Sequence, residues 1–541
     1  MMKLQSLAVA ALIATMPFGA PGVTAGAPQA QESARYEDRL GLRAGEIDTL
    51  VARTMEAFKV PGMAVGIIQD GKVVHAKGYG VREVGKKGKV DDETLFSIAS
   101  TGKSFTAAAL SLLVDEGHLR WDDKVIDYIP EFQMHDPWVT REFTIKDLLI
   151  HNSGLGLGAG DLMWWPTSGF SRDEIIRNMR HLKPVSSFRT EYAYDNLLYI
   201  VAGEVIAAVS GQSYEAFVDS RILKPLGMKH CAADRRRLKG HKNIAEPHVL
   251  VDGTLETTFR LEEVYEPSIT AAAGGIQCSI KSILKWHALH LSGGKLPDGS
   301  VFLSEAEQAR IMTPQTITPV SKSRQDWFGT SFSAYGLGWF LEDLYGMKVA
   351  RHSGGLQGMT SLNMLVPELD LGIVVYTNQQ AGYDRQAILY SILEAYLTDN
   401  RTDWVSKLLT LQETRLKEAA EAEPDLEAAP YTPSGDLGRY AGTFRDPWFG
   451  EVVIEQAADG LRFTARRSAR LKGRMVPYKD DLFIVRWEDR ALKADAYVNF
   501  SKGFDGTLSG FTMKAVSPLT DFSFDFHDLD FKRTKNAGGH S

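Results

Sequence analysis

The residues with the clearest chemical potential are a serine and a lysine three positions apart, Ser100 and Lys103. At the start of a helix this spacing places both side chains on one face. A serine hydroxyl is a weak nucleophile that needs a neighbouring base, and a lysine can be that base where burial lowers its pKa. The first turn of a helix also offers free backbone N–H groups to a developing oxyanion. The pair therefore predicts nucleophilic acyl transfer, although an isolated Ser-x-x-Lys is common on solvated helices.

Two other motifs of similar appearance do not fit. Gly102, Lys103 and Ser104 look like the end of a phosphate-binding loop, but Ser97 stands where that loop requires its first glycine. Ser153 lacks the first glycine of a Gly-x-Ser-x-Gly nucleophile turn. The serine–lysine pair remains the predicted catalytic pair.

Two segments farther along complete a known set of motifs. Tyr194 and Asn196 precede an apolar helical run, and His352 and Gly354 lie in a strand-rich region. Ser-x-x-Lys, Tyr-x-Asn and then Lys-Thr-Gly or His-x-Gly are the motifs of the penicillin-recognising serine hydrolases, which the chain resembles over about residues 45–400. The family includes class C β-lactamases, D-alanyl-D-alanine carboxypeptidases, D-aminopeptidases and related esterases. Segments 148–155, 225–228, 273–276 and 335–339 also resemble it.

The resemblance implies a role for each matching residue. Ser100 would attack the acyl carbon, while Lys103 and Tyr194 would share the proton transfers; which of the two is the resting base stays open. Asn196 would hydrogen-bond the substrate amide and steady the lysine. The backbone N–H groups of Ser100 and Gly355, the residue after the motif glycine Gly354, would form the oxyanion hole, where one donor is worth about 2.7–4 kcal/mol. His352 would line the site and meet the carboxylate or amide of the substrate.

The third motif departs from Lys-Thr-Gly in a way that bears on the substrate. His352 is mostly neutral at pH 7, so the permanent charge that would grip a β-lactam or a C-terminal carboxylate is missing. We therefore expect a peptidase or esterase, with slow or absent turnover of the β-lactam nitrocefin. Family members of this form act on small nonribosomal peptides with D-residues, linearised microcystin among them, and such peptides are the expected substrates. Trp164 and Trp165 are candidates to clasp an apolar substrate group, core packing being the alternative.

Two alternatives remain beside this main hypothesis. Within the same fold, the protein could be an esterase, a β-lactamase or a D-alanyl carboxypeptidase. In a different class, it could be a non-catalytic protein that binds peptidoglycan fragments. The complete set of Ser100, Lys103 and Tyr194 argues against the second, because a binding protein has no need of all three.

The elements expected to position these residues follow from periodicity. Apolar residues at helical spacing predict a helix over residues 47–58, and Asp70 and Gly71 between two β-rich runs predict a hairpin. A helix is expected over 100–116 and another over 383–397, with strands at 335–341, 361–366 and 371–376. Strands thus open and close this region and helices fill its middle, which indicates an antiparallel sheet built from both ends. With the resemblance, the predicted fold is α/β: a β-lactamase-like sheet flanked by helices, with an all-helical lobe.

The C-terminal part has a different composition. Residues 415–431 are acidic, alanine-rich and bounded by prolines, which indicates the end of a helix and a linker. From 432 onward short apolar runs separated by turns predict an all-β domain, a sandwich or a lipocalin-like barrel, with Phe522, Phe524 and Phe526 alternating as in a half-buried strand. The expected organisation is a signal peptide at 1–25, a hydrolase domain at 26–414, a linker at 415–431 and a β domain at 432–541.

Composition and the N-terminal sequence indicate which partners are unfavourable and where the protein is located. The 541 residues carry a net charge of −7, which is unfavourable for binding nucleic acid. A single early lysine, an apolar stretch and small residues at 23–25 predict a signal peptide cleaved after Ala25, and hence an exported, periplasmic or secreted protein without a membrane span. Export permits a disulfide between Cys231 and Cys278, which the sequence leaves open. His287 and His290 lack further ligands at useful spacing, so neither a metal nor another cofactor is expected, and the oligomeric state is not predicted.

Overall fold

The structure is a computed structural model that describes residues 41–238, 240–259, 268–356, 358–380, 382–425, 431 and 436–534. The expected signal peptide at 1–25 lies outside the described residues.

An antiparallel sheet forms the centre of the first part of the chain, in the order β2-β1-β13-β12-β11-β10-β9-β8. The sheet is built from both ends of this region, as predicted, because β1 pairs along its length with β13. Both strands are buried almost throughout, as expected for apolar strands covered on both faces. The strands are β1 (Gly62–Gln69), β2 (Lys72–Gly80), β8 (Thr316–Ile317), β9 (Ser333–Tyr335), β10 (Phe340–Leu344), β11 (Met347–Leu356), β12 (Met359–Val366) and β13 (Leu371–Thr377).

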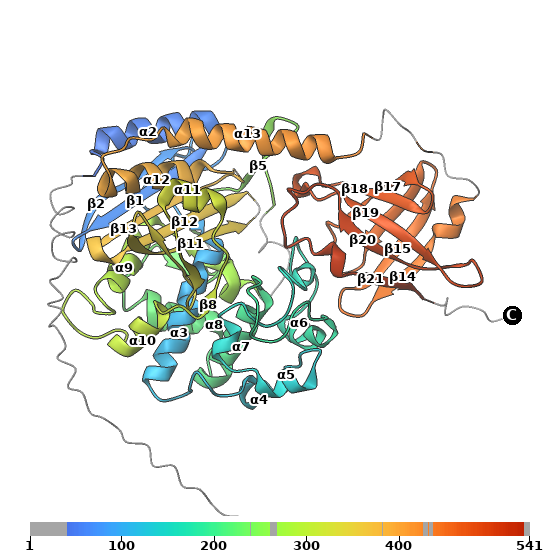
Figure 1. The fold of residues 1–541 in the computed structure, drawn as a ribbon, viewed down its shortest axis with the longest axis horizontal. Coiled ribbons are helices and arrows are strands. Elements are labelled where there is room, and N and C mark those ends of the chain that lie inside the picture. Colours follow the sequence, from blue (N-terminus) through green and yellow to red (C-terminus); the bar gives the residue numbers. More distant parts are fainter. Residues whose placement is uncertain are drawn as a thin grey trace, which may run out of the picture. The chain divides into compact units, whose positions relative to one another are not determined.

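Helices cover the two faces of this sheet. On one side lie α2 (Ala44–Phe58), α12 (Asp384–Leu397) and α13 (Trp404–Ala422), and on the other α9 (Ile280–Leu291) packs on β1 and β13 (Figure 1). α3 (Lys103–Asp115) is buried over nearly its whole length against α7 (Leu197–Ser210). The remaining α-helices are α4 (Val125–Tyr128), α5 (Pro137–Glu142), α6 (Arg172–Asn178), α8 (Tyr214–Val218), α10 (Glu305–Ile311) and α11 (Lys322–Phe328).

Most of the elements predicted for this part of the chain are present, with one change. The helix over 47–58 and the hairpin at Asp70 and Gly71 are confirmed. The strand expected at 335–341 is instead the end of β9, a turn, and the start of β10. In that turn Gly338 has φ of 79°, and a Cβ there would lie 2.9 Å from the backbone oxygen of Lys103. Glycine therefore lets the turn approach the start of α3.

A small sheet supports the segment before Ser100. β3 (Phe96–Ser97), β7 (Gln277–Cys278) and β4 (Cys231–Ala232) pair in that order. Cys231 and Cys278 face each other in the register and form a disulfide, which settles the pairing that the sequence left open. A hairpin of β5 (His248–Val251) and β6 (Thr254–Thr257) lies elsewhere in the chain.

The C-terminal part is a closed antiparallel barrel, in which β14 pairs with both β15 and β21. Leu461, Phe463 and Ala465 of β16 alternate with more exposed neighbours, as in strands that turn one face to a barrel interior. The strands are β14 (Gly442–Asp446), β15 (Gly450–Ala457), β16 (Gly460–Ala465), β17 (Lys472–Lys479), β18 (Leu482–Trp487), β19 (Ala496–Lys502), β20 (Leu508–Ala515) and β21 (Asp530–Arg533).

Two C-terminal expectations need correction. α13 continues to Ala422, so residues 415–422 of the expected linker are helical. The segment with Phe522, Phe524 and Phe526 is not a strand but a connection between β20 and β21. Phe522 packs on Tyr194 and Phe524 packs on Trp165, both in the first part of the chain, and Phe524 also stacks on Phe526.

Among the described residues, no single helix has the length and apolar character of a membrane span. One pair of helical segments, residues 197–210 and 214–223, passes that test together, but it is bent by 73°.

Candidate active site

Ser100 lies in a short 3₁₀ turn, Ala99–Gly102, that leads directly into α3. Ala99, just before it, has a left-handed backbone with φ of 49°. Such a conformation costs a non-glycine residue about 1–3 kcal/mol and persists where the surroundings impose it, often at functional sites. The Ser100 side chain is partly exposed and lines a pocket. The strained turn thus presents the hydroxyl at the start of a buried helix.

Lys103 is the most deeply buried cation of the site, with 0% of its surface exposed. Its Nζ lies 3.1 Å from Ser100 Oγ and donates to Asn196 Oδ1 and to the Ala273 carbonyl oxygen, both at 2.7 Å. Burial lowers the pKa of Lys103 to about 7, against the opposing effect of buried Asp161 and a second nearby carboxylate. An amine of this pKa is half neutral near pH 7, and can therefore accept a proton.

Tyr194 lies beside this pair on the segment that leads into α7. Its ring centroid is 4.9 Å from Lys103 Nζ and 4.3 Å from the ring centroid of His151. Burial raises the pKa of Tyr194 well above its usual value, and the Ser100 hydroxyl opposes that shift. The phenol is therefore protonated at neutral pH, which suits it to relay a proton rather than to take the first one.

Both ends of the Asn196 amide have a protein partner. Its Oδ1 accepts from Lys103, and its Nδ2 donates to Asp161 Oδ2 at 2.8 Å. The predicted contact with Lys103 is therefore present. One N–H bond of the amide is directed at Asp161, and Asn196 also lines the pocket, so its contact with a substrate stays a prediction.

His352 is held as a neutral ring on β11. Its Nδ1 lies 2.6 Å from the carbonyl oxygen of Ser353, which can only accept, so Nδ1 carries the hydrogen. Its Nε2 then accepts from the Tyr335 hydroxyl at 3.0 Å. Burial lowers the pKa of His352 to about 3. The ring lines the pocket, but both nitrogens have protein partners and it carries no charge for a substrate carboxylate.

The two glycines after His352 have different surroundings. A Cβ on Gly354 would collide with the Ile98 carbonyl oxygen and lie 2.9 Å from Ala99 Cβ, so glycine allows β11 to pack on the nucleophile turn. A Cβ on Gly355 would meet nothing within 4 Å, and Gly355 lines the pocket together with Ser100. The pair expected to form the oxyanion hole thus borders the same space.

The two tryptophans do not form the exposed clasp that the sequence suggested. Trp164 is 7% and Trp165 4% exposed, so the alternative of core packing applies. Trp164 contributes to the pocket wall and donates from Nε1 to Asp161 at 2.8 Å. Trp165 packs against Trp164 and against Phe524.

The pocket around Ser100 has a volume of about 280 Å³. Its lining comes from three parts of the chain: the helical region, strands β10 and β11 of the sheet, and the connection between β20 and β21 of the barrel. The lining residues are Ser100, Trp164, Tyr192, Tyr194, Asn196, Thr270, Ala273, Gly274, Phe340, His352, Ser353, Gly355, Leu356, Asp521, Phe522 and Ser523. Lysine and arginine are absent from this set of described residues.

Several contributors to the site were not predicted, among them His151, Asp161, Phe522 and Ser523. His151 stacks on Tyr194 and lies in the family-like segment 148–155, whose resemblance could have pointed to it. Asp161 contacts Asn196 but is an isolated acid in a glycine-rich stretch. Phe522 and Ser523 belong to the barrel, and nothing in their local sequence ties them to a site around residue 100.

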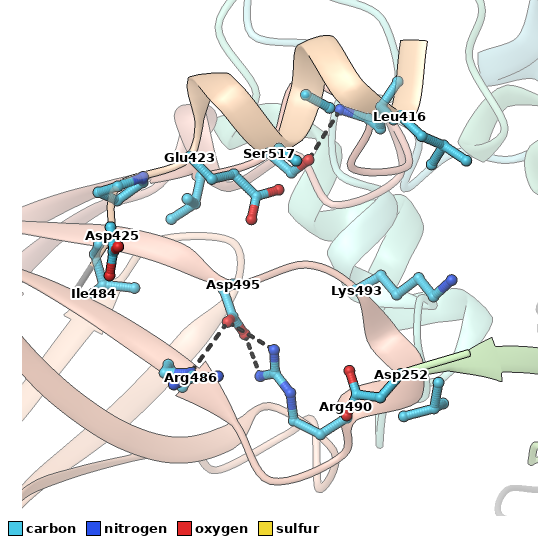
Figure 2. A pocket seen from close by; sticks show the side chains of 16 residues that line it. Asp252, Leu416, Glu423, Asp425, Ile484, Arg486, Arg490, Lys493, Asp495 and Ser517 are labelled. Carbon is cyan, nitrogen blue, oxygen red and sulfur yellow. Dashed lines mark hydrogen bonds and ion pairs between the residues drawn. The ribbon is translucent and has the colours of Figure 1, made fainter. Parts of the chain in front are cut away.

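A second cavity, of about 450 Å³, lies between α13 and the barrel (Figure 2). Figure 2 shows Arg486 and Arg490 directed at Asp495, with closest separations of 3.8 and 2.7 Å. None of the motif residues lines this cavity. His287 and His290 are both buried, and the described residues contain no cluster able to hold a metal ion.

Comparisons with known proteins agree with this geometry. Unguisins hydrolase ungD' of Aspergillus campestris (strain IBT 28561) is 29% identical over 484 residues, covering 85% of this chain and 87% of that protein. Protein flp of Staphylococcus aureus (strain NCTC 8325 / PS 47) is 27% identical over 62% of this chain and 64% of its own. The octameric penicillin-binding protein homologue from Pyrococcus abyssi shares the fold, with a TM-score of 0.59 and 22% identity, covering 91% of this chain and 100% of that one.

Two family models match the chain. The model described as Domain of unknown function (DUF3471) matches residues 426–533, which include the barrel. The Beta-lactamase model matches residues 47–397, well over half of the chain, and this span holds the three motifs. The chain therefore belongs to the Beta-lactamase family of penicillin-recognising serine hydrolases.

Proposed function

We propose that the protein is a serine peptidase that works through an acyl-enzyme, with Ser100, Lys103 and Tyr194 as its catalytic residues. The observation that carries this proposal is the 3.1 Å separation between Ser100 Oγ and the Nζ of a fully buried lysine. A lysine whose pKa burial lowers to about 7 is neutral often enough to serve as a general base.

The surroundings of Lys103 point its lone pair toward the serine. A neutral amine has two N–H bonds and one lone pair. Asn196 Oδ1 and the Ala273 carbonyl oxygen can only accept, so they take the two N–H bonds. The lone pair is left for the third neighbour, the Ser100 hydroxyl, which donates its proton to Nζ.

The reaction then follows in two halves. Ser100 Oγ forms a bond to the acyl carbon as its proton passes to Lys103, and the backbone N–H groups of Ser100 and Gly355 stabilise the oxyanion. The tetrahedral intermediate breaks its bond to the leaving amine, which takes a proton from the Tyr194 hydroxyl; the proton on Lys103 replaces it. Water then attacks the ester carbon as its proton passes to Lys103. The bond to Ser100 Oγ breaks, Oγ takes that proton back, and the acid and free Ser100 are released.

The expected substrates are small peptides, nonribosomal or containing D-residues. The pocket has aromatic walls in Trp164, Tyr192, Phe340 and Phe522, and its described lining has no lysine or arginine to hold a terminal carboxylate. The relative named unguisins hydrolase supports a hydrolytic function. A β-lactamase of this fold would instead need a cation for the β-lactam carboxylate, so we expect little or no turnover of nitrocefin; efficient turnover would favour that alternative.

The test has two stages. Fluorophosphonate treatment should add its mass to Ser100 in the wild-type protein and not in Ser100→Ala; an unlabelled but correctly folded protein would favour a binding function. A panel of linear D-residue peptides, their L-residue counterparts, linearised microcystin and unguisins is then analysed by mass spectrometry to locate each cleaved bond. Cleavage of simple acetate esters alone would favour an esterase.

We also propose that the protein is exported. The N-terminal sequence supports a signal peptide cleaved after Ala25, and the Cys231–Cys278 disulfide is of the kind that persists in oxidising compartments. Mass spectrometry of the mature N-terminus in a cell fraction tests both points; an intact N-terminus in the cytosol would refute them.

A further inference from the structure

A segment of the barrel enters the hydrolase part beside the catalytic residues. Between β20 and β21, Asp525 accepts hydrogen bonds from the backbone N–H of Gly160 at 2.6 Å and of Leu162 at 3.1 Å. Two residues earlier, Ser523 Oγ donates to Asp161 Oδ2 at 2.7 Å. Ser523 and Asp525 are both buried. The barrel thus holds the backbone and one side chain of segment 160–162.

Asp161 is the centre of this contact. It is fully buried and accepts from three donors: Trp164 Nε1 at 2.8 Å, Asn196 Nδ2 at 2.8 Å and Ser523 Oγ. Three hydrogen bonds fix the position of a carboxylate that would be costly to bury unpaired. Asn196 contacts both Asp161 and Lys103, so one side chain links the carboxylate to the lysine.

The orientation of the Asn196 amide depends on Asp161. Burial raises the pKa of Asp161 to about 7, so above that pH the carboxylate is ionised and can only accept; the amide N–H₂ must then face Asp161, and the amide oxygen must face Lys103. In the opposite orientation the N–H₂ group would donate to the lysine lone pair, and the lysine would be unable to take the proton of Ser100. The carboxylate therefore decides whether Lys103 can act as a base.

We propose that Asp161 is a positioning residue for Lys103, and that the barrel residue Ser523 holds Asp161 in place. The C-terminal barrel then contributes directly to the geometry of the active site. This inference rests on the proposed function of Ser100 and Lys103.

The charge of Asp161 also affects the pKa of Lys103. The groups that face Lys103 are the carboxylates Asp161 and Asp195, the rings of Tyr194 and Tyr199, and the imidazoles of His151 and His352. The two carboxylates raise the pKa of Lys103, whereas both imidazoles are kept neutral by burial. Asp161 is ionised above its own raised pKa of about 7, so removing its charge should lower the pKa of Lys103 there and move the upper part of the acidic limb of the rate profile to lower pH.

The experiment uses the full-length chain and measures the rate of Ser100 labelling by a fluorophosphonate across pH. Asp161→Asn should lower the plateau rate by about tenfold or more and shift the acidic limb downward by about one pH unit. Ser523→Ala should lower the rate by about threefold, and Ser523→Thr, which keeps the hydroxyl, should restore it. Ser509→Ala, on an exposed position of β20, is the matched control and should leave the rate unchanged.

The possible results distinguish a failure of the proposed function from a failure of the positioning role of Asp161. If wild-type protein is not labelled, the proposed function itself fails. The positioning role is refuted if the wild type is labelled but Asp161→Asn has the wild-type labelling rate and the same acidic limb. It is also refuted if Ser523→Ala is labelled at the same rate as the Ser509→Ala control. Thermal unfolding of each variant shows whether it folds; should Asp161→Asn fail to fold, the Ser523→Ala and Ser523→Thr pair decides the question.

Discussion

The rate of Ser100 acylation should fall as the pH drops below about 7, because Lys103 accepts a proton only when neutral. Burial lowers the pKa of Lys103 from 10.5 to about 7. The pKa of His352 lies at about 3 and that of Tyr194 well above its usual value, so neither titrates near neutrality. Burial raises the pKa of Asp161 to about 7, so Asp161 and Lys103 titrate together over the same pH range.

The size of the effect follows from the neutral fraction of Lys103. That fraction is one half at the pKa and roughly one-tenth one pH unit below it, so the rate near pH 6 should be about one-tenth of the plateau. An unperturbed lysine would be neutral in only about one molecule in three thousand at pH 7, so burial increases the amount of free base about a thousandfold. The activity is therefore present above the lowered pKa and is lost below it.

The assay is fluorophosphonate labelling followed by mass spectrometry, with folding at each pH checked by circular dichroism. Lys103→Arg is the matched control: guanidinium stays charged throughout, so labelling should be about 10²–10⁴-fold slower at every pH. A wild-type rate that stays level from pH 8 to pH 5, or one that rises only near pH 10, would refute the assignment of Lys103 as a buried base.

Three further predictions concern stability and the pocket. Replacing Cys231 and Cys278 by serine opens a crosslink of sequence separation 47 and should lower the free energy of unfolding in urea by about 4 kcal/mol; an unchanged midpoint would contradict it. Gly354→Ala should lower both the melting temperature and the labelling rate, whereas Gly355→Ala, whose Cβ has open space, should leave the melting temperature within a degree or so; equal melting temperatures would show that the close packing at Gly354 is not required. Phe522→Ala opens one pocket wall and should raise KM for aromatic peptides far more than for p-nitrophenyl acetate, and an equal change for both would count against a substrate contact.

The proximity of Ser100 and Lys103 was predictable because the two residues are close in sequence. Ser100 and Lys103 are three residues apart, and their spacing alone places them together once α3 begins. Tyr194 and His352 lie far along the chain, and only the order of the family motifs joined them to the pair. The sheet was predictable for a similar reason, since apolar runs at both ends of the region indicated strands such as β1 and β13.

The errors arose where tertiary contacts decide local structure. The spacing of Phe522 and Phe524 is that of a strand, yet Phe522 packs on Tyr194 and Phe524 on Trp165, both in the hydrolase region. For Trp164 the sequence left open a substrate contact or core packing; its indole is buried and donates to Asp161, and Trp164 also lines the pocket. Local periodicity contains no information on partners that come from another domain.

The contact between Asp161 and Ser523 joins residues 362 positions apart and explains why a hydrolase would keep a barrel at its C-terminus. A lysine base requires a dry site, since contact with water would return its pKa toward 10.5. The segment that orients Asn196 through Asp161 also places Phe522 against Tyr194 and so covers one wall of the pocket. Orientation of the amide and exclusion of water are thus provided by the same few residues. A change that loosens this segment should therefore raise the pKa of Lys103 and slow acylation together, rather than affect either one alone.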